Sequence, residues 1–236
     1  HPGVVWLAES VHKSFGEEMR QRGLYCATDA EAFEAFDVEY EYDVREAFDA
    51  YMRGEAALSH WLDLLCFQEE VYPANYSKLR FLENHDQSRA HFMIPDRRAL
   101  MNFTAFSFFQ KGMAFVYAGQ EFGATHLPSL FDRDTVTMSP KDGIDLSDFI
   151  ARLSKIKKSP VFSDSTYRVT DGGNDICIAT HKKDDHMALG VFSLKGKSGV
   201  VSVPMPDGLY KNALTEETVE VFHGGLSCGG EPIIIL

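Results

Sequence analysis

Carboxylate, amide and imidazole side chains follow three short apolar runs, at the points where strands would give way to loops. The segments are Val4–Glu9, Phe81–Asp86 and Phe115–Glu121. The carboxyl ends of parallel strands meet at one rim in α/β proteins, and active sites lie at that rim. A carboxyl group at the end of a buried strand is partly desolvated, which suits it to hold a proton at neutral pH. Glu9 is therefore the candidate acid.

Each of these segments also has a structural interpretation. A carboxylate just beyond an apolar strand is often a helix N-cap or a solvated loop residue. Gln120 and Glu121 fit a structural role, tying a loop to neighbouring backbone, better than a chemical one. Asn84–Asp86 satisfies no helix-capping rule and so favours chemistry. Together with His91 it would also fit a metal-dependent phosphohydrolase, but the acidic net charge and the missing further His-Asp pairs argue against that enzyme and against a metal site.

The predicted secondary structure changes near residue 160, from alternating strands and helices to strands alone. Earlier, short apolar runs alternate with helical patterns, which indicates βα units and a parallel sheet. After Pro160, short strands are separated by glycine-containing turns such as Asp171–Asn174, which predicts an antiparallel β-sandwich. We expect two domains, residues 1–159 and 160–236. The predicted helices are Asp29–Phe36, Asp43–Arg53, Ala56–Val71, Pro95–Lys111 and Ile144–Lys158, and the predicted strands are Val4–Ala8, Leu79–Leu82, Ala114–Tyr117, Thr166–Thr170, Ile176–His181, Met187–Leu194, Gly199–Val203, Val219–Phe222 and Pro232–Leu236.

Composition narrows the classes of partner. The 236 residues include 23 Lys and Arg against 35 Asp and Glu, a net charge of −12, which disfavours nucleic acids and anionic membrane surfaces. Neutral, polyhydroxylated ligands fit better. The longest apolar run, Met101–Tyr117, is interrupted by polar residues and predicts no membrane crossing. The four cysteines form no C-x-x-C pair, so reduced thiols and a cytoplasmic location are expected, whereas an export signal upstream of residue 1 would make the protein extracellular.

Three segments in order resemble one enzyme family. Phe81–Arg89 resembles the Asn-His-Asp motif at the end of the seventh barrel strand in the α-amylase superfamily, glycoside hydrolase family 13. Gly112–Glu121 resembles that family's eighth-strand segment ending in Gly-Gln-Glu, and Val4–Glu9 resembles the fifth-strand segment that ends in the catalytic glutamate. Phe36–Tyr42 falls where the sixth strand belongs. The resemblance implies an α/β fold: the C-terminal half of a TIM (β/α)8 barrel, followed by an all-β antiparallel sandwich.

The resemblance also implies roles for particular residues. Glu9 is then the general acid/base that protonates the glycosidic oxygen and later activates water. Asp86 is the second carboxylate, which binds sugar hydroxyls and stabilises the oxocarbenium-like transition state. His85 hydrogen-bonds the same sugar, and Arg89 and His12 are the other substrate-binding candidates, with Arg89 also suited to orient a nearby carboxylate. The substrate is an α-glucan or an oligosaccharide.

The family's retaining mechanism needs one group more. Its nucleophilic aspartate lies at the fourth strand, which precedes the first segment matched here, so the nucleophile is expected in an N-terminal half of the same protein and this chain alone is expected to be inactive. No cofactor is expected in the chain itself, and a calcium ion belongs to the upstream part of the family's fold. Half a barrel leaves sheet edges and an apolar face open, which predicts self-association.

Two alternatives remain open at this stage. A non-catalytic carbohydrate-binding or interaction protein of the same superfamily would keep the fold without the chemistry. An aspartate two residues after an arginine at the fourth strand would favour the enzyme. Starch binding by the β-domain alone has little support, because no tryptophan follows Trp61.

Overall fold

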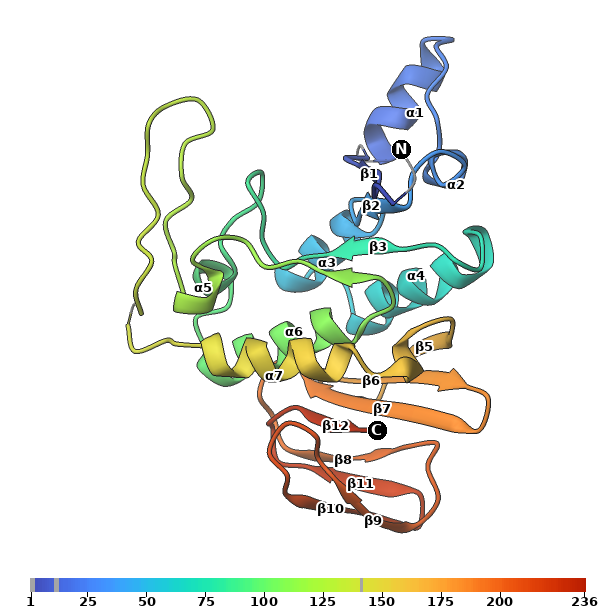
Figure 1. Cartoon of the computed structure of the whole chain (residues 1–236), viewed down its shortest axis with the longest axis vertical. Coiled ribbons are helices and arrows are strands. Elements are labelled where there is room, and N and C mark those ends of the chain that lie inside the picture. The colour runs from blue at the N-terminus through green and yellow to red at the C-terminus, as the bar shows by residue number, and fades with distance from the viewer. Residues whose placement is uncertain (1–2, 11–12, 141) are drawn as a thin grey trace. The chain divides into compact units, whose positions relative to one another are not determined.

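A computed structural model of the chain describes residues 3–10, 13–140 and 142–236 (Figure 1). The chain divides into two compact units. The first comprises the chain up to Arg80 together with Lys111–Ala114, and the second comprises Phe81–Gln110 and the chain from Phe115 onward. The polypeptide therefore leaves the first unit after one strand of its sheet and returns to it for the next.

A parallel four-stranded sheet forms the centre of the first unit. Its strands, in order across the sheet, are β1 (Leu7–Ala8), β2 (Val38–Tyr40), β3 (Lys78–Arg80) and β4 (Met113–Ala114). Every neighbouring pair is parallel, so each strand must be followed by a crossover connection. This succession of parallel strands and helices confirms the prediction of half a TIM barrel.

Four helices belong to the first unit. They are α1 (Lys13–Gln21), α2 (Asp29–Ala32), α3 (Arg45–Met52) and α4 (Leu58–Val71). α2 begins with a capping box, in which Thr28 Oγ1 accepts the Glu31 N–H and the Glu31 carboxylate accepts the Thr28 N–H at 2.8 Å. α3 and α4 pack through Phe48 and Trp61, whose rings meet edge to face at 5.0 Å. α1 was not predicted.

The sheet of the first unit buries charged side chains. Glu39 of β2 stands opposite Lys78 of β3, both side chains are fully buried, and Lys78 Nζ lies 3.0 Å from Glu39 Oε2. Lys78 also contacts the Asp29 carboxylate and lies 3.4 Å from Asp43. One buried cation therefore faces three carboxylates.

β4 approaches β3 where only glycine fits. Gly112 has a φ of 111°, and a Cβ there would lie 2.2 Å from the Lys78 carbonyl oxygen. Arg80 donates from Nε to the Lys111 carbonyl at 2.6 Å, and its guanidinium pairs with Glu41. Backbone contact and a buried arginine together fix the returning strand.

Helices and sheets share the second unit. Its helices are α5 (Ala90–Met93), α6 (Arg97–Phe109) and α7 (Ser147–Lys157), with the short 3-10 helices η1 (Gln120–Phe122) and η2 (Pro160–Phe162). Asp96 caps α6 by accepting the Ala99 N–H at 2.8 Å. Phe106 and Phe109 of α6 pack on Phe192, with ring centroids 5.4 and 5.5 Å apart. α6 therefore belongs to the same compact unit as the strands that follow it.

Two antiparallel sheets form the C-terminal part and confirm the predicted sandwich. One contains β12 (Ile233–Ile235), β7 (His186–Ser193), β6 (Ile176–Lys183) and β5 (Thr166–Asp171), and the other β8 (Gly199–Ser202), β11 (Gly225–Cys228), β10 (Thr218–Phe222) and β9 (Gly208–Lys211). Their shared core is aliphatic, built from residues such as Leu189, Val191, Val201 and Leu226. β9 and β11 were not predicted.

The strands begin after residue 160, as expected, whereas the domain boundary at 159/160 stays a prediction. Self-association likewise stays a prediction. Among the described residues, no helix has the length and apolar character needed to cross a membrane. The four cysteines are present as thiols.

Candidate active site

The segment after β3 presents the Asn-His-Asp triplet in the second unit. Asn84 is fully buried, and its Oδ1 accepts the Asp86 backbone N–H at 2.9 Å. His85 is half-buried and Asp86 is exposed, with His85 Nε2 3.4 Å from Asp86 Oδ2. The buried Asn84 amide thus fixes the backbone of the segment from which the His85 and Asp86 side chains reach the surface. This arrangement suits an imidazole and a carboxylate that form hydrogen bonds with the hydroxyl groups of a ligand.

Arg89 is buried beneath this segment. Its guanidinium lies 2.9 Å from the Glu83 carboxylate, with 0% and 1% of the two side chains exposed. It also donates to the Ala118 carbonyl at 2.8 Å and lies over the Tyr117 ring, 4.9 Å from the centroid. Arg89 therefore orients a carboxylate, one of the roles expected of it, and that carboxylate is Glu83. The Arg89 side chain is fully buried, and its role in substrate binding stays a prediction.

Glu83 is held in an environment that disfavours its charge. Burial raises the pKa of Glu83 to about 7, while a hydrogen bond from the Ala90 N–H and the Arg89 charge act in the opposite direction. Glu83 was not predicted as a functional residue, because its position between Leu82 and Asn84 gives no sign of the arginine that pairs with it. Glu83 therefore holds Arg89 and the Ala90 backbone in place and does not itself reach the surface.

The Gly-Gln-Glu segment has a structural role. Gly119 has a φ of 85° and precedes η1. The buried Gln120 accepts the Tyr117 N–H through Oε1 at 3.1 Å, and the Glu121 carbonyl accepts the Leu146 N–H at 2.7 Å. The segment ties a loop to neighbouring backbone, as its composition indicated.

Glu9 lies directly after β1, in the first unit. It lines a cleft of about 840 Å³, together with Ser10, Lys13, Phe15 and Tyr72 among other residues. Glu9 is exposed, so the partial burial expected at the end of the strand is not present. β1 accounts for the difference, because within the described sheet it pairs with β2 alone and its flanking residues are exposed.

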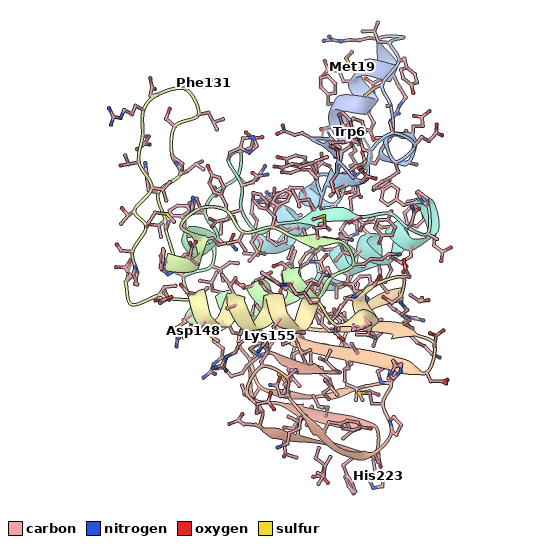
Figure 2. All side chains as sticks on the ribbon, in the orientation of Figure 1. Trp6, Met19, Phe131, Asp148, Lys155 and His223 are labelled. Carbon is pink, nitrogen blue, oxygen red and sulfur yellow. The ribbon has the colours of Figure 1, made fainter. Side chains whose placement is uncertain are left out.

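The remaining predicted residues divide among different parts of the structure. His85 and Asp86 come together in the second unit, while Glu9 is described within the first. His12 lies outside the described residues. Trp6, labelled in Figure 2, is 54% exposed, although its place within the apolar run Val4–Ala8 is typical of a core residue.

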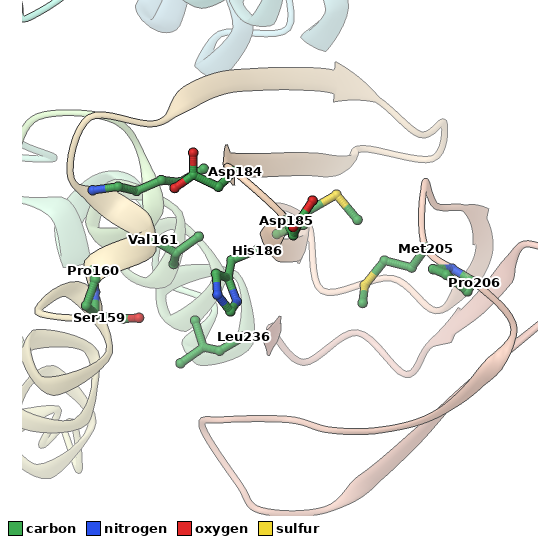
Figure 3. Close-up of a pocket in the computed structure, with 11 residues that line it drawn as sticks. Ser159, Pro160, Val161, Asp184, Asp185, His186, Met205, Pro206 and Leu236 are labelled. Carbon is green, nitrogen blue, oxygen red and sulfur yellow. The ribbon is translucent and has the colours of Figure 1, made fainter.

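The second unit also contains a cavity of about 540 Å³ (Figure 3). Its lining includes Pro160, Val161, His186, Met205 and Leu236. Among the described residues that line it, none is Phe, Tyr or Trp. The cavity therefore lacks the flat carbocyclic rings on which sugars stack.

Comparison with known proteins identifies α-amylases among the proteins similar to this chain. The family model for the bacterial α-amylase C-terminal domain matches residues 168–235. A crystal structure of an α-amylase from Lactobacillus plantarum matches with a TM-score of 0.92 and 35% identity, over 99% of this chain and 56% of that one. An α-amylase from Saccharomycopsis fibuligera is 29% identical over 146 residues, which are 60% of this chain and 28% of the relative.

A more distant structure agrees in fold. The maltogenic α-amylase AmyB from Thermotoga neapolitana matches with a TM-score of 0.76 and 24% identity, over 94% of this chain and 57% of that one. The chain thus spans little more than half the length of these two solved structures. The findings confirm the resemblance to the α-amylase superfamily, glycoside hydrolase family 13, to whose C-terminal half the chain corresponds.

Proposed function

We propose that the chain is the part of an α-glucan-active retaining glycosidase that supplies the acid/base and one transition-state-stabilising carboxylate. Glu9 protonates the glycosidic oxygen and later removes a proton from the incoming water or sugar. Asp86 and His85 hold hydroxyl groups of the sugar at the cleaved bond. The observation that carries the proposal is the surface placement of His85 and Asp86 on a buried Asn84, in a chain 35% identical to an α-amylase.

The geometry of each unit supports a separate part of this mechanism. The exposed Glu9 carboxylate lies in a cleft large enough for sugar rings. The side chain of Asp86 is of the type that stabilises an oxocarbenium ion. Retaining double displacement also requires a nucleophilic carboxylate about 5–5.5 Å from the acid/base. We expect an N-terminal part of the same protein to provide it.

The experiment compares Glu9→Gln and Asp86→Asn in the full-length protein on starch and on glycosides with good leaving groups. Glu9→Gln should abolish starch cleavage and spare the first step on activated glycosides, because these leave without a proton. Asp86→Asn should lower kcat on both substrates. Glu34→Gln, an exposed change in the first unit, serves as the control and should leave both activities intact.

Each result has a distinct meaning. Full starch cleavage by Glu9→Gln would contradict the acid/base role. A wild-type protein that binds glucans and cleaves neither starch nor activated glycosides would instead favour a carbohydrate-binding function.

A further inference from the structure

The loop that carries Asp86 is closed by the side chain of one residue. This loop, residues 84–89, connects the segment after β3 to the start of α5, and Glu83 immediately precedes it. One carboxylate oxygen of Glu83 accepts the Ala90 N–H, and the other lies 2.9 Å from Arg89 Nη2. A single carboxylate therefore joins the two ends of the loop.

The ends of the loop are buried, whereas its middle reaches the surface. Asp86 is exposed, and the residues at the two ends are at most 1% exposed: Glu83, Asn84, Arg89 and Ala90. Asn84 Oδ1 holds the first half of the loop by accepting the Asp86 N–H at 2.9 Å. Glu83 holds the second half, where the chain returns to α5. Asp86 lies between these two anchors, so its position depends on both.

Arg89 is itself held from several sides. The nitrogen that faces Glu83 also donates to the Ala118 carbonyl at 2.8 Å, and the guanidinium carbon lies 4.9 Å from the centroid of the Tyr117 ring. A Cβ at Gly119 would lie 3.3 Å from the same nitrogen, so the backbone of that segment packs closely against the guanidinium. Such a packed pair has little room to rearrange. The Glu83 carboxylate therefore determines where the loop ends.

The two contacts require a carboxylate at this position. Both groups that face it are donors, the Ala90 N–H and the Arg89 guanidinium. A carboxylate accepts through both oxygens, whereas glutamine, of the same size, has one accepting oxygen and one donating NH2 group. Glu83→Gln therefore sets a donor against a donor at the end of the loop and leaves the buried charge of Arg89 without its partner.

We propose that Glu83 is a positioning residue for Asp86, which acts on the reaction through the loop 84–89. The proposal rests on the proposed function, because that function gives Asp86 its role at the transition state. Transition-state stabilisation by a charged group is sensitive to a displacement of about 1 Å. A loosened loop should therefore lower kcat and leave KM nearly unchanged.

A double-mutant cycle in the full-length protein tests the proposal, with Glu83→Gln, Asp86→Asn and the two changes combined. The substrate is an aryl maltoside, whose good leaving group keeps slow variants measurable. Glu83→Gln alone should lower kcat about 10- to 100-fold and change KM by less than about twofold. In the Asp86→Asn background it should lower the remaining kcat by less than about threefold, because the group that it positions has already lost its charge.

The possible results separate the two proposals. Reductions of kcat by the same factor in both backgrounds, or an unchanged kcat in Glu83→Gln alone, would overturn the positioning role and leave the proposed function intact. A wild-type kcat in Asp86→Asn would contradict the proposed function and the positioning role with it.

Glu41→Gln is the matched control, because it breaks another buried pair of a glutamate and an arginine, Glu41 with Arg80 in the first unit. It should lower the free energy of unfolding, as Glu83→Gln does, and leave kcat per folded molecule unchanged. A reduction of kcat as large as that of Glu83→Gln would count against the positioning role. Glu83→Asp keeps the charge and shortens the side chain by one methylene group. It replaces Glu83→Gln in the cycle if that variant does not fold, and it should lower kcat only where Asp86 is intact.

Discussion

The parallel sheet of the first unit and the C-terminal sandwich of the second bury different kinds of side chain. In the first, the central strands place Lys78 against Glu39, with both side chains fully buried. In the second, aliphatic residues such as Leu189 and Leu226 fill the space between two sheets. A buried ion pair adds little net stability yet is costly to break, whereas an apolar core stabilises in proportion to the area it buries. The parallel sheet should therefore respond to changes in charge and the sandwich to changes in volume.

Lys78→Ala should have the largest effect on stability. It leaves Glu39, Asp29 and Asp43 without their shared cation and should cost about 3–5 kcal/mol. Hydrogen exchange should show the lost protection concentrated in the first unit. The double variant Lys78→Met with Glu39→Leu removes both charges of the central pair and should recover much of the loss. Equal losses in the single and double variants would mean that volume, not charge, governs this core.

Leu226→Ala tests the other kind of core. Leu226 is fully buried between the sheets, and its truncation should cost about 3 kcal/mol through lost burial and the cavity left behind. The loss should be the same at pH 5 and at pH 8 and should appear in hydrogen exchange of the second unit. A loss of stability that depends strongly on pH would contradict the distinction between a charged and an apolar core.

Glu39 should make the first unit sensitive to pH. Desolvation raises the pKa of Glu39 from its ordinary 4.5 to about 7, so between these values the folded state binds a proton more tightly than the unfolded state. The stabilisation is complete below pH 4.5 and is lost as the pH rises through 7, by up to about 3 kcal/mol. Denaturant unfolding at pH 5 and pH 8 measures this slope. Glu39→Gln should reduce the slope to the part that comes from Glu83, whose pKa burial also raises to about 7, and Leu226→Ala should leave it unchanged.

Helix caps should have the smallest effect and should not distinguish the units. Thr28→Ala removes the cap of α2 and Asp96→Ala that of α6, and each should cost about 1 kcal/mol. Both caps satisfy backbone N–H groups locally, so their values should agree within experimental error. A much larger loss in one of them, measured by thermal unfolding, would reveal a tertiary role for that side chain.

Sequence patterns predicted those parts of the fold in which apolar periodicity is strong. The strands after residue 160 and helices such as α4 and α6 were found within a few residues of their bounds. β9 and β11 were missed because each contains few apolar residues and begins at a glycine, which reads as a turn. The strand predicted over Val4–Ala8 is observed only over Leu7–Ala8, and most of the apolar residues of the predicted range are exposed.

The candidate site was predictable to the extent that its residues are adjacent in the chain. His85 and Asp86 form a local motif, and the structure holds them together on Asn84. The burial of Arg89 could not be read from the sequence, because it depends on the tertiary approach of Glu83 and Tyr117. The charged interior at Lys78 was equally hidden, since a lysine inside a short strand resembles an exposed residue until its partners are placed.

The late return of β4 to the first sheet bears on how the polypeptide is made. The sheet is incomplete until Ala114 has been synthesised, and by then the residues of α5 and α6 have already been produced. During translation, the edge of β3 that pairs with β4 therefore stays unpaired until β4 has been synthesised. Because the chain passes between the units at Arg80, Gln110 and Ala114, no single proteolytic cut separates them into two contiguous fragments.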